Sequence, residues 1–322
     1  MNICLVGYGA IAESHAKALT AIDDVNLRWL VGRRTEPTQA FATRFGFEHL
    51  TLELDEALAD DCVEAVVITS PNALHAPQAT AALGAGKHVL LEIPIALTLD
   101  DAQRVAALAR QVDRKLMICH STRFYPSFAY LRELVDAGKF HMYQFIGNMF
   151  IRRRTNITAA GNPRSWTDNI LWHHGAHLID LSMWLADCFD VERVSYHVGP
   201  NYKEQATMDM SFTMTLANGA IVTISQSYFT PAFGWQVKAI GHEQTFCWKD
   251  FVLYDFEDNE IMPYTDGWDL LVQDTEFVNA LREDRDPSVT AESIMPTMRA
   301  IAQAQAIMDA QTPTTSPYEG DD

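Results

Sequence analysis

Three histidines and one aspartate in the middle of the chain are the side chains best suited to proton transfer. His173, His174, His177 and Asp180 lie in a segment with helical character. Residues three or four apart on a helix are neighbours, so His177 can face either of the other histidines, and Asp180 can orient a ring. Because histidine titrates near neutral pH, it suits general-base catalysis. We predict that His177 is the base and that His173 or His174 contacts the substrate or relays a proton.

Two other interpretations of this histidine segment stay open. His173 and His177 have the spacing of a metal-binding pair, for which Asp180 could be a third ligand. The chain contains no H-E-x-x-H sequence, however, and we predict no metal. Each histidine could also be a structural side chain packed among the nearby tryptophans, although this interpretation is hard to extend to all three at once.

Arginines supply a second kind of chemistry, the recognition of anions. Arg123 follows a strand-like segment, Arg153 and Arg154 belong to a run of three arginines, and Arg164 lies in the loop before the histidine segment. Guanidinium forks at separated points would suit a dicarboxylate. If the run is extended, its members alternate between two faces, so at most two of them point the same way. We predict that Arg123, Arg153 and Arg154 bind a small anionic substrate, and the alternative for the run is a solvated edge.

The first dozen residues predict a site for a dinucleotide. A short apolar strand, residues 2–6, leads into a G-x-G-x-x-A turn and then into an amphipathic helical stretch. This arrangement is typical of a dinucleotide-binding βαβ unit, in which the pyrophosphate lies at the helix N-terminus. The turn residues expected to contact the cofactor are Gly7, Gly9, Ala10, Ile11 and Ala12.

The end of the second strand-like segment indicates which dinucleotide is bound. Sites that prefer NAD usually place an acidic residue there, to bind the ribose hydroxyls. This chain has Arg33 and Arg34 instead. No carboxylate repels a 2′-phosphate at this point, and two guanidinium groups could hold one. We therefore predict NADP as the cofactor, with NAD as the alternative and two solvated surface arginines as the structural interpretation.

The composition excludes several classes of partner. The formal net charge of the 322-residue chain is −18, which disfavours nucleic acid and anionic membranes. No apolar run reaches the length of a membrane span, and no signal-peptide pattern is present. The five cysteines are widely spread without a C-x-x-C, which argues for reduced thiols. We therefore expect a cytoplasmic protein with no nucleic-acid partner and no membrane partner.

The order of the predicted elements indicates two domains. Strand-like and helix-like segments alternate through the first third of the chain, which predicts a doubly wound parallel sheet. Strand-like runs dominate later, and Asn218-Gly219 is a strong hairpin signal. We predict an α/β fold, with a Rossmann domain over residues 1–120 and an α+β domain with an open, mainly antiparallel sheet over residues 121–322. The final helix could pack back on the first domain.

Three further motifs are spread over the middle of the chain. They are S-P-N-A-L-H at residues 70–75, E-I-P at residues 92–94 and H-x-x-D at residues 177–180. They resemble the T-P-N-x-x-H, E-K-P and H-x-x-D motifs of the Gfo/Idh/MocA oxidoreductases. The resemblance implies a nicotinamide cofactor and no metal. The residues for which it implies cofactor contacts are Ser70, Pro71, Asn72, His75, Glu92, Pro94, Arg164 and Trp166.

Two positions depart from the usual pattern of that family. Ile93 stands where the family has its catalytic lysine, and His173 stands where an aspartate is common. Together with R-R-T-N, P-R-S-W-T-D and L-W-H-H at residues 153–174, they resemble one branch, the 4-carboxy-2-hydroxymuconate-6-semialdehyde dehydrogenases. The resemblance implies that a cyclic hemiacetal is oxidised by NADP to the lactone 2-pyrone-4,6-dicarboxylate, with His177 removing the hemiacetal proton.

Two other functions stay open on the sequence alone. The wider family contains sugar, inositol and sugar-acid dehydrogenases, but the altered lysine and aspartate positions count against that specificity. Non-catalytic regulators that sense dinucleotides share the fold and need no base, so the histidine segment argues against them. Members of the family are commonly dimers or tetramers, which predicts a homodimer or a homotetramer.

Overall fold

The computed structural model describes residues 1–151, 169–199, 207–230, 233–266 and 269–311. The chain divides into two compact units, Met1–Ser121 with Trp268–Met295, and Thr122–Gly267 with Pro296–Asp322. The sequence predicted a single boundary near residue 120, whereas the structure also assigns Trp268–Met295 to the first unit. The reason is that helix α8 (Leu271–Arg282) packs against α1 (Ala10–Thr20). The last helix, α9 (Ala291–Asp309), begins in the first unit and continues in the second.

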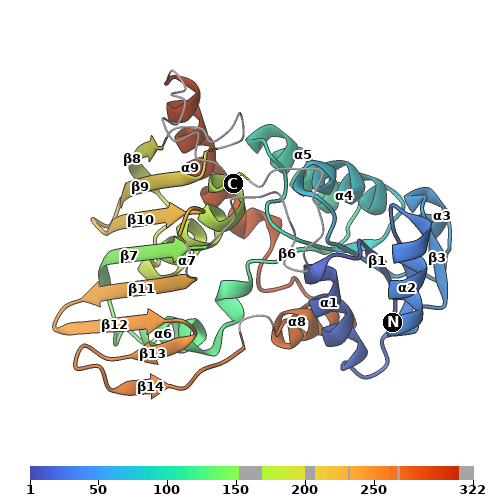
Figure 1. The fold of residues 1–322 in the computed structure, drawn as a ribbon, viewed down its shortest axis with the longest axis horizontal. Coiled ribbons are helices and arrows are strands. Elements are labelled where there is room, and N and C mark those ends of the chain that lie inside the picture. Colours follow the sequence, from blue (N-terminus) through green and yellow to red (C-terminus); the bar gives the residue numbers. More distant parts are fainter. Residues whose placement is uncertain (152–168, 200–206, 231–232, 267–268, 312–322) are drawn as a thin grey trace, which may run out of the picture. The chain divides into compact units, whose positions relative to one another are not determined.

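The first unit is built on a six-stranded parallel sheet with the strand order β3-β2-β1-β4-β5-β6 (Figure 1). Its strands are β1 (Asn2–Val6), β2 (Asn26–Val31), β3 (His49–Thr51), β4 (Ala65–Ile68), β5 (His88–Leu91) and β6 (Leu116–Ile118). Besides α1 and α8, its helices are α2 (Thr35–Phe45), α3 (Leu54–Leu58), α4 (His75–Gly84) and α5 (Leu99–Gln111). Strands and helices alternate along the chain, as a doubly wound sheet requires.

Burial explains why the central strands of this sheet are continuous apolar runs. Every residue of β4 is buried, and β5 is buried after its first residue. A parallel sheet covered by helices on both faces demands this pattern, because no strand face meets water. The register also aligns the strand ends, since Val6 of β1 pairs with both Val31 and Ile68, and Ile68 pairs with Leu91. The loops that follow these strands therefore leave the sheet at one common edge.

The second unit contains an eight-stranded sheet with the order β14-β13-β12-β11-β7-β10-β9-β8. Its strands are β7 (Met142–Phe150), β8 (Val191–Val198), β9 (Asp209–Leu216), β10 (Ile221–Ser227), β11 (Gly234–Gly241), β12 (Gln244–Lys249), β13 (Val252–Tyr254) and β14 (Glu260–Met262). Only the β7–β10 pairing is parallel among these described strands, and the others are antiparallel. The expected hairpin joins β9 and β10, where Gly219 has a φ of 86° that glycine adopts easily.

Helices cover one face of this second sheet. Helix α7 (Ala176–Ala186) packs against β7 and β10, and α6 (Pro126–Asp136) packs against α7 (Figure 1). Alternation along the strands matches this one-sided cover, because Val222, Ile224 and Gln226 of β10 are buried while the residues between them are half-buried. The fold class predicted from the sequence is therefore confirmed for both sheets. No helix within the described part of the chain is long and apolar enough to cross a lipid bilayer.

Candidate functional site

Two glycines shape the edge of the first sheet where β1 ends. Gly7 has a φ of 121°, and a Cβ there would lie 2.4 Å from the Thr69 hydroxyl oxygen. Gly9 is the N-cap of α1, and a Cβ built on it would meet no atom within 4 Å. The backbone at the start of α1 is therefore open to a ligand, and free N–H groups and the helix dipole favour an anion there. These residues fit the pyrophosphate of a dinucleotide.

This geometry predicts that Gly9 serves the cofactor and contributes little to the fold. Gly9→Ala meets no steric obstacle in the protein, so the melting temperature should stay within a few degrees of wild type. The added methyl group should hold a pyrophosphate away from the helix N-terminus and weaken dinucleotide binding by roughly ten- to a hundredfold, the range for charge-assisted hydrogen bonds. Calorimetric titration measures the affinity, and unchanged affinity in a stable Gly9→Ala protein would contradict the assignment.

His75 joins the two loops that follow β4 and β5. Its Nδ1 lies 2.7 Å from the Pro94 carbonyl oxygen, and its Nε2 lies 2.8 Å from the Ser70 carbonyl oxygen. The ring is buried, and burial lowers the pKa of His75, while the hydrogen bonds to the two carbonyl groups act in the opposite direction. The sequence predicted a cofactor contact for His75, Ser70 and Pro94. The structure shows that His75 fixes the relative position of the two loops.

A buried charged cluster behind Glu92 was not predicted from the sequence. His15 of α1 directs Nδ1 toward Asp274 of α8, 2.8 Å away, and Nε2 toward Glu92 Oε1, 3.1 Å away. Burial alone would lower the pKa of His15, but the Asp274 carboxylate raises it well above the usual value. The Cys119 thiol lies beside His15 and Glu92, and burial raises the pKa of Cys119. The contact between His15 Nε2 and Glu92 Oε1 therefore helps to hold the Glu92 carboxylate in place.

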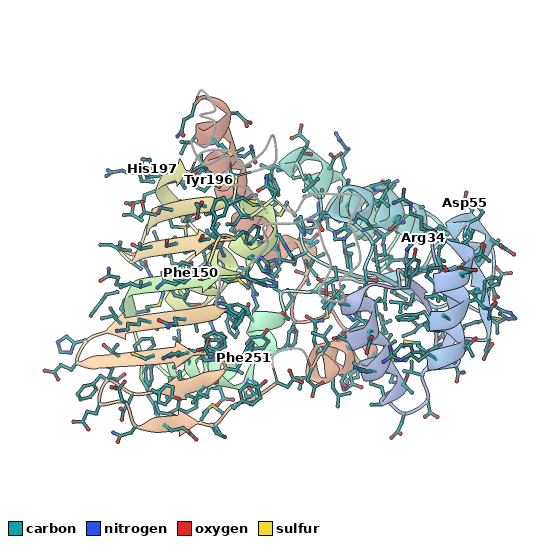
Figure 2. The ribbon with its side chains drawn as sticks, viewed as in Figure 1. Arg34, Asp55, Phe150, Tyr196, His197 and Phe251 are labelled. Atoms are coloured by element: carbon teal, nitrogen blue, oxygen red, sulfur yellow. The ribbon has the colours of Figure 1, made fainter. Side chains whose placement is uncertain are left out.

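Arg33 and Arg34 both follow β2 and are both exposed, as the prediction of a phosphate contact requires. Gly32 brings this turn close to α2, because a Cβ there would lie within 1.8 Å of the Thr38 hydroxyl oxygen. Arg34, labelled in Figure 2, is the N-cap of α2, and its carbonyl accepts a hydrogen bond from that hydroxyl. The backbone of the turn is thus fixed.

In the second unit, a π-helical turn leads directly into α7. Leu171–Gly175 forms this turn, and the Gly175 N–H bonds to the carbonyl of Ile170, five residues earlier. Such turns are rare and occur often at functional sites. From residue 170 to residue 183, His173 and His177 are the only two side chains that are not buried. The structure therefore presents these two histidines together at an accessible point of an otherwise buried segment.

His174 differs from the other two histidines because its side chain is buried, whereas theirs are half-buried. Its Nδ1 lies 2.7 Å from the hydroxyl oxygen of Tyr228, a residue that the sequence analysis did not single out. The His173 and His174 rings are 4.0 Å apart between centroids, although neighbours on a helix usually point in different directions. The hydrogen bond to Tyr228 fixes the His174 ring, and the His173 ring packs against the His174 ring. Tyr228 follows β10 with no motif around it, so the sequence carried no signal for this contact.

Arg123 and Asp180 form a buried ion pair with each other. The Arg123 Nε and Nη2 atoms donate to the two Asp180 carboxylate oxygens at 2.8 and 2.6 Å, and both side chains are almost fully buried. Thr297 of α9 adds a third hydrogen bond to Asp180 at 3.1 Å. The sequence predicted that Arg123 binds substrate and that Asp180 orients a histidine ring. The structure gives both residues a structural role that the sequence did not predict.

Four of the predicted site residues lie outside the described part of the chain. They are Arg153, Arg154, Arg164 and Trp166, for which substrate or cofactor contacts were expected. Those roles remain predictions.

Comparison with known proteins identifies the family. Residues 1–120 match the model of the oxidoreductase family with an NAD-binding Rossmann fold (Gfo/Idh/MocA), and residues 126–263 match that of the C-terminal domain of bacterial oxidoreductases. The chain is 33% identical to 4-carboxy-2-hydroxymuconate-6-semialdehyde dehydrogenase of Sphingobium sp. SYK-6 over 97% of its own length and 100% of that protein. It is 24% identical to an NADP-dependent scyllo-inositol 2-dehydrogenase of Bacillus subtilis, over 76% of this chain and 68% of that one.

Solved structures agree on the fold. GenD2 from gentamicin A biosynthesis, in complex with NAD, superimposes with a TM-score of 0.82 at 24% sequence identity, over 97% of this chain and 95% of that one. The chain belongs to the Gfo/Idh/MocA oxidoreductase family. It is a dehydrogenase that uses a nicotinamide dinucleotide, and within the family it resembles the semialdehyde dehydrogenase branch. The prediction of family and branch is confirmed.

Proposed function

We propose that this enzyme oxidises the cyclic hemiacetal of 4-carboxy-2-hydroxymuconate-6-semialdehyde to 2-pyrone-4,6-dicarboxylate with NADP. The observation that carries the proposal is the pair of accessible histidines, His173 and His177, in a segment that is otherwise buried. The end-to-end similarity to the Sphingobium enzyme supports this substrate. We also propose that the enzyme forms a homodimer or a homotetramer.

The residues of each unit have separate tasks in this reaction. In the first unit, Gly7, Gly9 and the N-terminus of α1 hold the pyrophosphate, and Arg33 with Arg34 holds the 2′-phosphate of the adenosine ribose. Accepting a hydride is the chemistry that the nicotinamide supplies when it is bound. In the second unit, His177 accepts the proton of the hemiacetal hydroxyl, so the oxygen can form the lactone carbonyl as the ring C–H bond breaks.

The loss of the family lysine fits this substrate. Ile93 is buried and offers no proton acceptor, so the work falls on the histidine segment. A hemiacetal hydroxyl is more acidic than a plain sugar alcohol, so a single imidazole can serve as its base. His173, which replaces the usual aspartate, is neutral or cationic, and either form suits a carboxylated substrate better than an aspartate does.

The direct test is turnover of freshly prepared 4-carboxy-2-hydroxymuconate-6-semialdehyde, followed by the absorbance of reduced nicotinamide. We expect rapid reduction with NADP and much slower reduction with NAD. The double variant Arg33→Ala/Arg34→Ala should lower kcat/KM for NADP by about ten- to a hundredfold, the range for lost hydrogen bonds to a charged phosphate, and leave NAD within about threefold.

Each part of the proposal can fail separately in this experiment. Equal use of NAD and NADP by wild type would overturn the cofactor assignment while leaving the substrate in place. Absence of turnover in a protein that still binds NADP would overturn the substrate. The compounds to test next would then be sugars, sugar acids and other cyclic hemiacetals.

A further inference from the structure

Gln226 and Trp235 are among the buried polar side chains of the second unit that have no hydrogen-bond partner within the described residues. Both amide atoms of Gln226 on β10 and the indole nitrogen of Trp235 on β11 are unpaired among the described residues. Gln226 is 1% exposed and Trp235 is 4% exposed. Because burying an unpaired polar group costs free energy, such groups are rare and require an explanation. A ligand that supplies the missing partners is one such explanation.

Strand register places the two side chains in one row across the sheet. Gln226 pairs with Met149 of β7, and Met149 pairs with Trp235 on the other side. All three are buried, so they lie on the face that α7 covers. Two strand spacings separate the Gln226 and Trp235 backbones by about 10 Å. A single small group is too short to contact both side chains, whereas a ring that carries substituents can reach both.

The same row lies against the histidine-bearing segment. A Cβ built on Gly175 in the π-helical turn would be 3.5 Å from the Gln226 amide oxygen. The His177 and Trp235 rings are 6.5 Å apart between centroids. The unpaired amide and the unpaired indole N–H therefore border the place where the proposed base lies.

The surroundings of Trp235 hold its ring firmly in one orientation. It makes edge contacts with Trp248 at 5.3 Å and with Phe251 at 6.0 Å between centroids. Phe251, labelled in Figure 2, and Asp250 have φ values of 73° and 47°, as the two-residue turn that joins β12 and β13 requires. A ring fixed in this way presents its N–H in a constant direction.

We propose that Gln226 and Trp235 form a substrate-recognition subsite for a planar ring that carries carboxylates. The indole N–H can only donate, so it suits a carboxylate oxygen. The amide can donate and accept, so it suits a carboxylate oxygen or the hemiacetal hydroxyl. The choice of a ring dicarboxylate rests on the proposed function. These two residues determine specificity, because a substrate without oxygens at these points leaves buried groups unpaired.

The test compares two variants that remove hydrogen-bonding atoms; Gln226→Met nearly keeps side-chain volume, whereas Trp235→Phe keeps an aromatic ring but makes it smaller. Gln226→Met and Trp235→Phe are each titrated calorimetrically with the lactone dicarboxylate, the product of the proposed reaction, in the presence of saturating NADP. We expect each variant to bind it at least about tenfold more weakly, the usual effect of one buried hydrogen bond. NADP affinity should be unchanged. Gln244→Met makes the same exchange at an exposed position of the same sheet and should behave as wild type.

The stability of the variants separates recognition from a structural role. Gln226→Met should keep or raise the melting temperature, since it removes an unpaired buried amide. Wild-type affinity for the dicarboxylate in both variants would overturn the subsite. A wild-type enzyme that binds the dicarboxylate but does not turn over the semialdehyde would overturn the proposed reaction and leave the subsite standing. A wild-type enzyme that binds no ring dicarboxylate would overturn both.

Discussion

Replacing His177 by glutamine is expected to lower kcat by roughly 10²- to 10⁴-fold, the usual contribution of a general base, while NADP affinity stays at the wild-type value. Glutamine keeps much of the size and the hydrogen-bonding capacity of histidine but cannot accept a proton at neutral pH. His177 is half-buried, and the other residues of α7 are buried except Trp184. The loss should therefore lie in the chemical step rather than in folding.

Steady-state kinetics and calorimetric NADP binding together check this result. His173→Gln should have a smaller effect on kcat, because His173 is assigned to substrate contact or proton relay. His197→Gln changes an exposed histidine of β8 and serves as the matched control (Figure 2). If His177→Gln turns over substrate as fast as wild type, His177 is not the base. A larger loss in His173→Gln would transfer the role to that residue.

Removing the Asp180 carboxylate is expected to lower the free energy of unfolding by about 3–5 kcal/mol, because Arg123 would remain as an uncompensated buried charge. The Asp180 side chain is fully buried, and that of Arg123 is 6% exposed. Trp184 lies under the guanidinium, with 5.6 Å between the Arg123 Cζ and the ring centroid, and offers no alternative counter-charge. Urea unfolding of Asp180→Ala measures the change.

A double variant distinguishes the structural role of this pair from a role in catalysis. Arg123→Met/Asp180→Leu replaces both charges by apolar side chains of similar size, which should recover most of the lost stability. If Asp180 also orients the His177 ring, kcat should stay low in the double variant although the protein is stable. Full recovery of kcat would assign the pair to the fold alone. A change below about 1 kcal/mol in Asp180→Ala would show that the pair is not the buried charge pair described.

Local sequence patterns determined the fold class and the place of the dinucleotide. Continuous apolar runs between glycine-rich turns are what a buried parallel strand requires, so β1, β4 and β5 could be predicted without knowing their neighbours. The G-x-G-x-x-A turn depends on the missing side chains of Gly7 and Gly9, a property of those residues themselves. His173 and His177 could be paired for the same reason, because helical spacing is local.

Only the tertiary structure decided which distant side chains meet. His15 and Asp274 are 259 positions apart, and their contact depends on α8 returning to pack on α1, which the predicted boundary near residue 120 did not anticipate. Gln226 and Trp235 share a row because β7 lies between their strands, and strand order is not encoded in the period of any one strand. Arg123 was predicted to bind substrate, because its ion pair with Asp180 of α7 forms only when the unit is folded. Local propensity depends on residues a few positions apart in the sequence, whereas these contacts join side chains that are far apart in the sequence and meet only when the chain is folded.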